Sequence, residues 1–293
     1  MSWLRRPAIE AKSEEQIGWM RQAGLVVART LALAAESAKP GTTTGELDRL
    51  AEEHIRSHHA VPSFKGYHGF PGSLCTSVND EVVHGIPGER VLAEGDLLSI
   101  DCGAIVNGWH GDAALSLIVG GPAMARPEDC AVLDDTETAL WAGITALSAG
   151  GRLYAVGEAV EESVQSSLQS RRSLQSQGAR EQRLSYGIVE DYVGHGIGTS
   201  MHMDPHVPNY AVSGKGPTVP VGATLAIEPM VTLGSIDTRT LDDDWTVVTA
   251  DGSRAAHWEH TVAVTEGGLW VLTALDGGAD ALATAGGTFA PLD

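Results

Sequence analysis

The sequence is poor in cysteine and contains no long hydrophobic run. Its three cysteines, Cys75, Cys102 and Cys130, are odd in number and far apart. They predict neither a disulfide framework nor a C-x-x-C zinc site, and they indicate a reducing compartment. No apolar run approaches the roughly 20 residues that span a bilayer, and residues 1–14 lack the hydrophobic segment of a signal peptide. We therefore expect a cytoplasmic protein that does not cross a membrane.

Positive charge is also scarce. Lys and Arg number 19 against 38 Asp and Glu, which gives a formal net charge of −19. A surface so acidic repels the phosphates of nucleic acids and anionic lipids, and this argues against nucleic-acid or membrane binding as the main activity. The same acidity suits a protein that concentrates cations, although solubility alone is the commoner reason for it.

The length and the hydrophobic content favour one large domain or two small ones. The chain has 293 residues, of which 43% are hydrophobic, enough for a sizeable core. Ser13 has the properties of a helix N-cap, and Gln16 three residues later completes a capping box. Thr44 is the expected cap of a second helix. The predicted helices cover residues 13–39, a segment that follows residue 44, residues 130–147 and residues 156–168.

Composition divides the chain into one long segment and three special regions. Residues 1–12 form an N-terminal extension, and residues 13–273 are expected to form a single domain. Within it, residues 165–183 are rich in Gln, Ser and Arg, which predicts an exposed insertion, either a loop or a frayed helix extension. Residues 274–293 are rich in Ala and Gly, so we expect a disordered C-terminal tail.

Three short patterns occur twice in the sequence, in the same order. They are a His-Gly-Ile motif, an apolar segment that ends on a carboxylate, and a carboxylate eight residues before a Gly-Gly pair. Such a repeat suggests two related halves packed about a pseudo-two-fold axis, with one central site that draws ligands from both halves. The paired residues are His84 and His195, Asp101 and Glu228, and Asp112 and Glu259.

Five residues are candidates for one chemical site. The four carboxylates among them lie inside or beside apolar strands, where burying an unpaired charge costs several kcal/mol. A single strand carboxylate is more often a turn cap or a surface charge, but the set as a whole indicates a shared cation. The candidates are Asp101, Asp112, His195, Glu228 and Glu259.

A predicted hairpin allows a geometric check on two of these carboxylates. A two-residue Asn-Gly turn at 107–108 places Gly103 opposite Asp112 and Asp101 opposite Ala114. Side chains alternate along a strand, so Asp101 and Asp112 would project from one face as diagonal neighbours about 7 Å apart. That spacing is too close for two bare anions in a core, but it suits carboxylates that grip metal ions about 3.5–4 Å apart.

The residue types indicate which cations such a site would hold. Four carboxylates and one histidine form a hard, oxygen-rich set, which favours Mn, Fe, Co or Zn in a two-metal centre. A structural zinc site would use cysteines instead. We therefore expect two divalent metal ions as cofactors.

The segments around these residues resemble the signatures of the type I methionine aminopeptidases, of the M24 metallopeptidase family. The resemblance runs from about residue 8 to 273, in order and at fitting spacing. It implies the α/β pita-bread fold, in which two pseudo-symmetric halves share a central, curved antiparallel sheet with helices outside. The segments that carry it are residues 79–87, 100–112, 195–205, 226–231 and 259–261.

The resemblance also implies a role for each candidate residue. All five would be metal ligands: Asp112 and Glu259 bridge both ions, Asp101 holds one, and His195 and Glu228 hold the other. Glu228 would also act as the catalytic proton carrier. His84 and His202 resemble the two histidines that contact the substrate without binding metal. The implied reaction is hydrolytic removal of the initiator methionine when the second residue is small.

The resemblance extends to the pocket for the methionine side chain. Such a pocket should be apolar and able to contact sulfur. The partner would be the N-terminal methionine of nascent polypeptides, met transiently at the ribosome, and nothing indicates more than a monomer. The residues that match the pocket by position are Tyr67, Phe70, Cys75, Met201 and Trp245, with Phe64 at its edge.

Three positions depart from the family pattern. Gly103 stands where the family usually has Thr, and Ala113 and Ala114 stand where it has Thr or Cys and then Ser. Hydrogen bonds to the metal-binding carboxylates are therefore expected to be missing, which could lower metal affinity or rate about tenfold or more. Two other interpretations stay open: a proline-specific aminopeptidase or prolidase of the same fold, and a non-catalytic binding protein that kept the fold.

Overall fold

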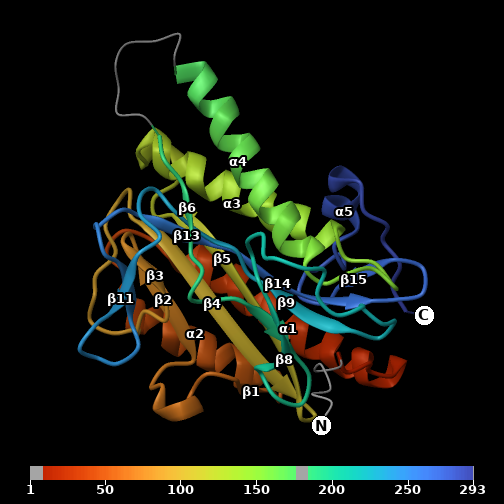
Figure 1. Cartoon of the computed structure of the whole chain (residues 1–293). Coiled ribbons are helices and arrows are strands. Elements are labelled where there is room, and N and C mark those ends of the chain that lie inside the picture. Colours follow the sequence, from red (N-terminus) through yellow and green to blue (C-terminus); the bar gives the residue numbers. More distant parts are fainter. Residues whose placement is uncertain (1–8, 176–183, 293) are drawn as a thin grey trace, which may run out of the picture.

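The computed structural model describes residues 9–175 and 184–292 (Figure 1). Its helices are α1 (Glu14–Ser37), α2 (Thr44–Ser57), α3 (Pro127–Thr145), α4 (Ala155–Gln175) and α5 (Ala279–Ala285), with 3₁₀ turns at Tyr67–Gly69 and Pro122–Met124. The strands of the large sheet are β1 (Val61–Pro62), β2 (Leu74–Val78), β4 (Leu97–Val106), β5 (Trp109–Ile118), β7 (Gly194–Gly196), β8 (Met203–Val207), β9 (Thr224–Ile227), β14 (Glu259–Val264) and β15 (Leu269–Val271). The strands of two small sheets are β3 (Glu81–Val83), β6 (Gly187–Ile188), β10 (Met230–Thr232), β11 (Thr238–Thr240), β12 (Val247–Thr249) and β13 (Ala255–His257).

The large sheet joins the two predicted halves in its centre. Its strands follow the order β1-β4-β5-β14-β9-β7-β8, with β2 beside β4 and β15 beside β14. Strands β5 and β14 pair antiparallel, with Glu259 opposite Ala114 and His260 opposite Ala113. In the order β4-β5-β14-β9, the second strand of each half (β5 or β14) lies at the centre, and the first strand (β4 or β9) lies outside it. The pseudo-symmetric α/β architecture expected from the sequence is confirmed.

Helices α1 and α2 cover one half of the sheet and α3 and α4 the other (Figure 1), and each half has a hydrophobic core of its own. One core joins α1 and α2 to β2, β4 and β5, through residues such as Val27, Leu47 and Ile100. The other joins α3 and α4 to β9 and β14, through residues such as Leu140 and Val160. Helices on one face leave the opposite face of the sheet free to carry a site.

The hairpin of β4 and β5 has the register predicted from its turn. Asp101 lies opposite Ala114, and Gly103 lies opposite Asp112. Asn107 and Gly108 both have positive φ, 50° and 81°, as a two-residue turn of this kind requires.

The first two helices begin almost where the sequence predicts. Ser13 and Gln16 form the expected capping box at the start of α1. At α2 the cap is Thr43, one residue before the predicted Thr44, because Glu46 stands three residues after Thr43 and completes a second capping box.

The insertion predicted at 165–183 begins as regular helix. Helix α4 continues to Gln175, so of the two predicted alternatives this part is the helix extension and not the loop, and residues 176–183 lie outside the described chain. Arg171 donates two hydrogen bonds to Asp135 of α3, at 2.5 and 2.8 Å, and Tyr186 donates a third to the same carboxylate at 2.6 Å. These contacts tie the polar end of α4 to the domain.

The prediction of a disordered tail at 274–293 is wrong for the described part of that segment. Residues 279–285 form α5, whose Leu282 is fully buried in the second core. Arg21 of α1 donates hydrogen bonds to the carbonyl groups of Leu272 and Ala274, at 2.8 and 2.5 Å, and Phe289 forms a bridge with Leu269. The prediction failed because a composition rich in Ala and Gly does not show that one leucine packs into the core, or that backbone carbonyl groups bind a distant arginine.

The predicted N-terminal extension is described only from residue 9. There Ala11 forms a bridge with Ala223, and the Lys12 N–H donates to the Gly222 carbonyl at 2.8 Å. Among the described helices none is both long enough and apolar enough to cross a bilayer.

Candidate metal centre and its cavity

A cavity of about 580 Å³ lies beside the central strands of the large sheet. Its walls contain every residue that the sequence assigned to metal, catalysis or substrate. These are Asp101, Asp112, His195, Glu228 and Glu259; His84 and His202; and Phe64, Tyr67, Phe70, Cys75, Met201 and Trp245.

Five adjacent strands each supply one candidate ligand. In sheet order, β4 carries Asp101, β5 carries Asp112, β14 begins at Glu259, Glu228 directly follows β9, and β7 carries His195. Side chains that project from one face of neighbouring strands converge because the strands lie only about 5 Å apart. The site is thus built from both halves of the chain.

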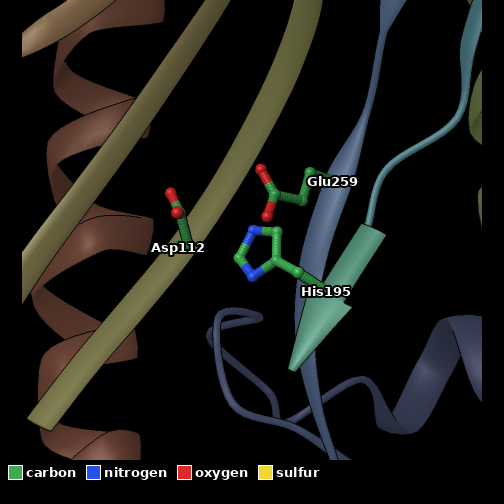
Figure 2. A group of neighbouring side chains, drawn as sticks. All are labelled: Asp112, His195 and Glu259. Carbon is green, nitrogen blue, oxygen red and sulfur yellow. The ribbon is translucent and has the colours of Figure 1, made fainter. Parts of the chain in front are cut away.

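Asp112, His195 and Glu259 form the tightest group (Figure 2). One ligand atom from each lies within 4.8 Å of the other two, and all three residues are buried. Glu228 adjoins this group, with its Oε1 3.5 Å from Nε2 of His195. These separations allow a shared cation to contact several of the side chains.

The carboxylates carry strongly perturbed pKa values. Burial raises the pKa of Asp101 to about 7. Burial, followed by repulsion from neighbouring carboxylates, raises the pKa values of Asp112, Glu228 and Glu259 well above their usual range. Four mutually repelling groups in one buried site require protons or cations to be stable there.

Unsatisfied oxygen atoms favour cations over protons alone. Asp101 Oδ1, Asp112 Oδ1 and Glu259 Oε1 are buried and have no hydrogen-bond partner within the described residues. Buried polar atoms normally have partners, so three such oxygens on converging side chains fit a metal-binding function. The donor set therefore fits divalent ions with oxygen and imidazole ligands.

His195 is oriented as a metal ligand. Its Nδ1 lies 2.9 Å from the carbonyl oxygen of Gly196, which can only accept, so Nδ1 carries the proton and donates. The lone pair of Nε2 then points toward Glu228. Burial lowers the pKa of His195 to about 3, which keeps the ring neutral. A neutral ring with one nitrogen fixed by a carbonyl is the usual state of a metal-bound histidine.

The two other predicted histidines stand on the wall of the cavity. The His202 ring lies 4.4 Å from the His195 ring, and its Nδ1 is 2.9 Å from the Tyr67 hydroxyl. His84 packs edge-on against Tyr192 and has a positive φ of 60°, a strained conformation of the kind found at functional sites. Burial lowers the pKa of His84 to about 4, so it too is neutral at pH 7.

An apolar pocket opens beside the histidines. Phe64, Phe70, Cys75 and Met201 form one buried cluster, and Trp245 packs edge-on against Phe70 with ring centroids 5.1 Å apart. Tyr67 and Ile86 pack against this cluster, and Tyr67 also lines the cavity. The cavity thus combines a polar, acidic side with an apolar pocket that includes two sulfur atoms.

His257 also lines the cavity and was missed in the sequence analysis. It is buried, its Nε2 has no hydrogen-bond partner within the described residues, and that atom lies 4.0 Å from Oε2 of Glu228. Its place two residues before Glu259 was the available signal. Tyr192 was missed as well, and no motif pointed to it.

Packing accounts for one of the three departures from the family pattern. A Cβ at Gly103 would lie 2.7 Å from Cβ of Ser63 and 2.9 Å from the Phe64 ring, so the position has no room for a threonine. Phe64 is also part of the apolar pocket. At position 103 the wall of the pocket therefore lies directly against β4.

The two alanines leave the carboxylates without local hydroxyl partners. Ala114 lies opposite both Asp101 on β4 and Glu259 on β14, and each of these carboxylates has an unpaired oxygen. Thr261 supplies support from β14 instead: its hydroxyl accepts from the Asp112 N–H at 3.1 Å and donates to the Asp112 carbonyl at 2.8 Å.

Comparisons with known proteins agree with this geometry. The model of metallopeptidase family M24 matches residues 18–266. The methionine aminopeptidase 1 of Mycobacterium tuberculosis is 50% identical over 269 residues, which cover 92% of this chain and 96% of that protein. The methionine aminopeptidase of Clostridium acetobutylicum is 47% identical over 263 residues, with 89% and 97% covered.

Solved structures show the same relationship. The crystal structure of the Thermotoga maritima methionine aminopeptidase matches with a TM-score of 0.80 and 37% identity, covering 90% of this chain and 99% of that one. The prolidase from Pyrococcus furiosus shares the fold at a TM-score of 0.67 but only 18% identity, and the match covers 65% of its chain. With its five converging candidate ligands and near-complete coverage by these relatives, the chain belongs to the methionine aminopeptidases of metallopeptidase family M24.

Proposed function

We infer that this chain removes N-terminal methionine from polypeptides by metal-dependent hydrolysis. The observation that carries the inference is the single cavity in which five converging ligands face an apolar pocket lined by Cys75 and Met201. The converging ligands suit metal-dependent hydrolysis, and the apolar pocket suits a thioether side chain. The identity with curated methionine aminopeptidases supports the same reaction.

We propose that Asp101, Asp112, His195, Glu228 and Glu259 hold two divalent ions, of Co, Mn, Fe or Zn. As the resemblance to the family implies, Asp112 and Glu259 would be shared by both ions, and together with His195 they form the tightest group of side chains. When bound, such ions lower the pKa of a coordinated water and polarise a carbonyl group. The pKa values of these carboxylates are raised by burial and mutual repulsion, so their charged forms need a cation to be stable, and bound ions would supply it.

Glu228 is proposed to carry the proton of the reaction. Its carboxylate borders the metal centre on one side and His257 on the other, at 3.5 Å from His195 and 4.0 Å from His257. From there it would accept the proton of the attacking water and pass it to the leaving amine. Burial raises its pKa in the metal-free protein, and bound ions would lower that pKa again and keep the carboxylate ionised, as a proton acceptor must be.

His202 and His84 are proposed to bind the substrate backbone. If the Tyr67 hydroxyl donates to Nδ1 of His202, the proton of that ring sits on Nε2 and can donate to the carbonyl oxygen under attack. His84, which is neutral and half-buried in the wall of the same cavity, would hydrogen-bond the backbone of the second residue.

The methionine side chain would enter the apolar pocket and exclude water from it. Tyr67, Phe70, Cys75, Met201 and Trp245 would contact it. A pocket of this kind rejects β-branched side chains by only a few kcal/mol, so discrimination would come from shape and from the fit of the thioether.

The proposal also covers the oligomeric state, the compartment and the partners of the enzyme. We propose a monomer in the cytoplasm that meets nascent chains transiently at the ribosome and binds neither nucleic acid nor membrane in its reaction. The unpaired state of Cys75, Cys102 and Cys130 supports a reducing compartment, and the net charge of −19 supports the lack of nucleic-acid binding.

Three peptides test the proposed reaction. Met-Ala-Ser should be hydrolysed, whereas acetyl-Met-Ala-Ser should not, because the free amine would be part of substrate binding. Ala-Pro-Ser tests the proline-specific alternative that the shared fold leaves open. Release of alanine from Ala-Pro-Ser without release of methionine from Met-Ala-Ser would overturn the proposal.

A further inference from the structure

Two histidines lie together at the C-terminal end of α2: His54 in its last turns and His58, the residue that caps the helix. His54 and His58 are four residues apart near the C-terminal end of the helix, and their ring centroids are 4.4 Å apart at an interplanar angle of 45°. Neither residue lines the cavity described above. Residues at this spacing share one face of a helix, so both rings can reach one ligand.

The hydrogen bond of His58 fixes the proton on one of its nitrogens. Its Nδ1 lies 2.9 Å from the carbonyl oxygen of His54, and a carbonyl oxygen can only accept. Nδ1 therefore carries the proton and donates. Ser57, 3.2 Å from the same Nδ1, donates its own hydroxyl proton to that carbonyl at 2.7 Å, which leaves its oxygen as a second acceptor.

The same logic applies to His54. Its Nδ1 lies 2.8 Å from Oγ1 of Thr30 on α1, and Thr30 donates its hydroxyl proton to the carbonyl of Val26 at 2.8 Å. The Thr30 oxygen must then accept, so Nδ1 of His54 also carries the proton. Both rings present the lone pair of Nε2, and within the described part of the chain neither Nε2 has a hydrogen-bond partner.

We propose that His54 and His58 form a second metal site, for a borderline divalent ion such as Zn²⁺, with water completing the coordination. With metal–nitrogen bonds of about 2.0–2.1 Å and a tetrahedral angle, two ligating rings would have centroids about 5 Å apart. The observed 4.4 Å is close to that separation, and a small rotation of the exposed His58 ring would close the difference. Histidines that bind metal commonly donate the other ring N–H to an oxygen of the protein, as both do here.

The electrostatic surroundings make the site a weaker one than the cavity. A cation at the C-terminal end of α2 lies near the negative end of the helix dipole, which is favourable. Arg29 on α1 would instead repel a bound cation. Its positive charge is the third cause, after burial and the charge of His58, that lowers the pKa of His54. That lowered pKa keeps the ring neutral, which is the form that binds metal. A bound ion would link α2 to α1 through His54 and Thr30.

Zinc counting with matched variants tests the proposal. Metal-stripped full-length chain, His58→Ala and His59→Asn would be dialysed against the same low-micromolar free Zn²⁺, and bound zinc would be counted per chain. His59 is the control because it is exposed, directly follows His58 and has a positive φ of 57° that asparagine tolerates. We expect His58→Ala to bind one zinc fewer than the unmodified chain, and His59→Asn to bind the same number.

Two further measurements separate this site from the cavity. His58→Ala should keep its metal-dependent release of methionine, which would show that the lost ion is not one of those in the cavity. Thr30→Val removes the acceptor for His54 Nδ1 and should weaken zinc binding at this site about tenfold. Equal zinc counts in the unmodified chain and His58→Ala would overturn the proposal, as would an equal loss in His59→Asn.

Discussion

Shortening Leu282 to alanine tests whether the C-terminal residues belong to the folded domain. Leu282 is fully buried in the core that α3 shares with β9 and β14. Leu-to-Ala substitutions in cores cost about 2–5 kcal/mol, and a site on a short helix at the edge of a core can relax, so we expect about 2–3 kcal/mol. For a domain of this size the melting temperature should fall by roughly 4–10 °C.

The matched control is the same substitution at Leu275. This residue belongs to the same C-terminal segment, but 59% of its surface is exposed. Leu275→Ala should change the free energy of unfolding by less than about 0.5 kcal/mol. The two variants would be compared by thermal and urea unfolding under identical metal conditions. An unchanged stability in Leu282→Ala, or equal losses in both variants, would refute the assignment of this segment to the core.

Three further predictions concern the site and its immediate support. In metal-free protein burial raises the pKa of Asp101 from 3.8 to about 7, so the folded state keeps a proton that the unfolded state loses between these values. The free energy of unfolding should therefore fall as pH rises from about 4 to 7. Urea titrations at several pH values should show a shallower fall for Asp101→Asn than for the unmodified chain. An identical dependence of the free energy on pH would contradict this. Gly103→Ala places a Cβ 2.7 Å from Ser63 and should lower the free energy of unfolding by about 1–3 kcal/mol, which an unchanged melting temperature would exclude. Tyr67→Phe removes one hydrogen bond to His202, so kcat for Met-Ala-Ser should fall roughly two- to tenfold with KM little changed; a loss confined to KM would show that Tyr67 only binds the side chain.

The sequence was most informative where one local rule determines the geometry. The Asn-Gly turn at 107–108 fixed the register of β4 and β5, and with it the shared face of Asp101 and Asp112. The repeated patterns indicated that ligands would come from both halves, and the strand order confirms two halves that meet at β5 and β14. Short-range turn geometry and strand alternation are physical constraints that need no knowledge of distant contacts.

The sequence was least informative where distant residues decide the outcome. The polar end of α4 is held against α3 by the hydrogen bonds from Arg171 to Asp135. Composition alone does not show such a distant partner. The C-terminal segment is folded because Arg21 binds its carbonyl groups and Leu282 fills a place in the core. His257 was missed because a histidine beside a known motif is ordinary until its burial and its unpaired Nε2 are seen.

The measurement that tests the central claim most directly is a metal titration of stripped protein in which bound ions and methionine release from Met-Ala-Ser are followed together. If the five converging residues hold the ions as proposed, there should be no release without metal, and activity should appear with ion binding and saturate when the centre is filled. Glu259→Ala, which removes one of the proposed bridging ligands, should bind fewer ions and stay inactive. Ion binding without release for any of Co, Mn, Fe or Zn would contradict the account and support a binding protein that kept the fold.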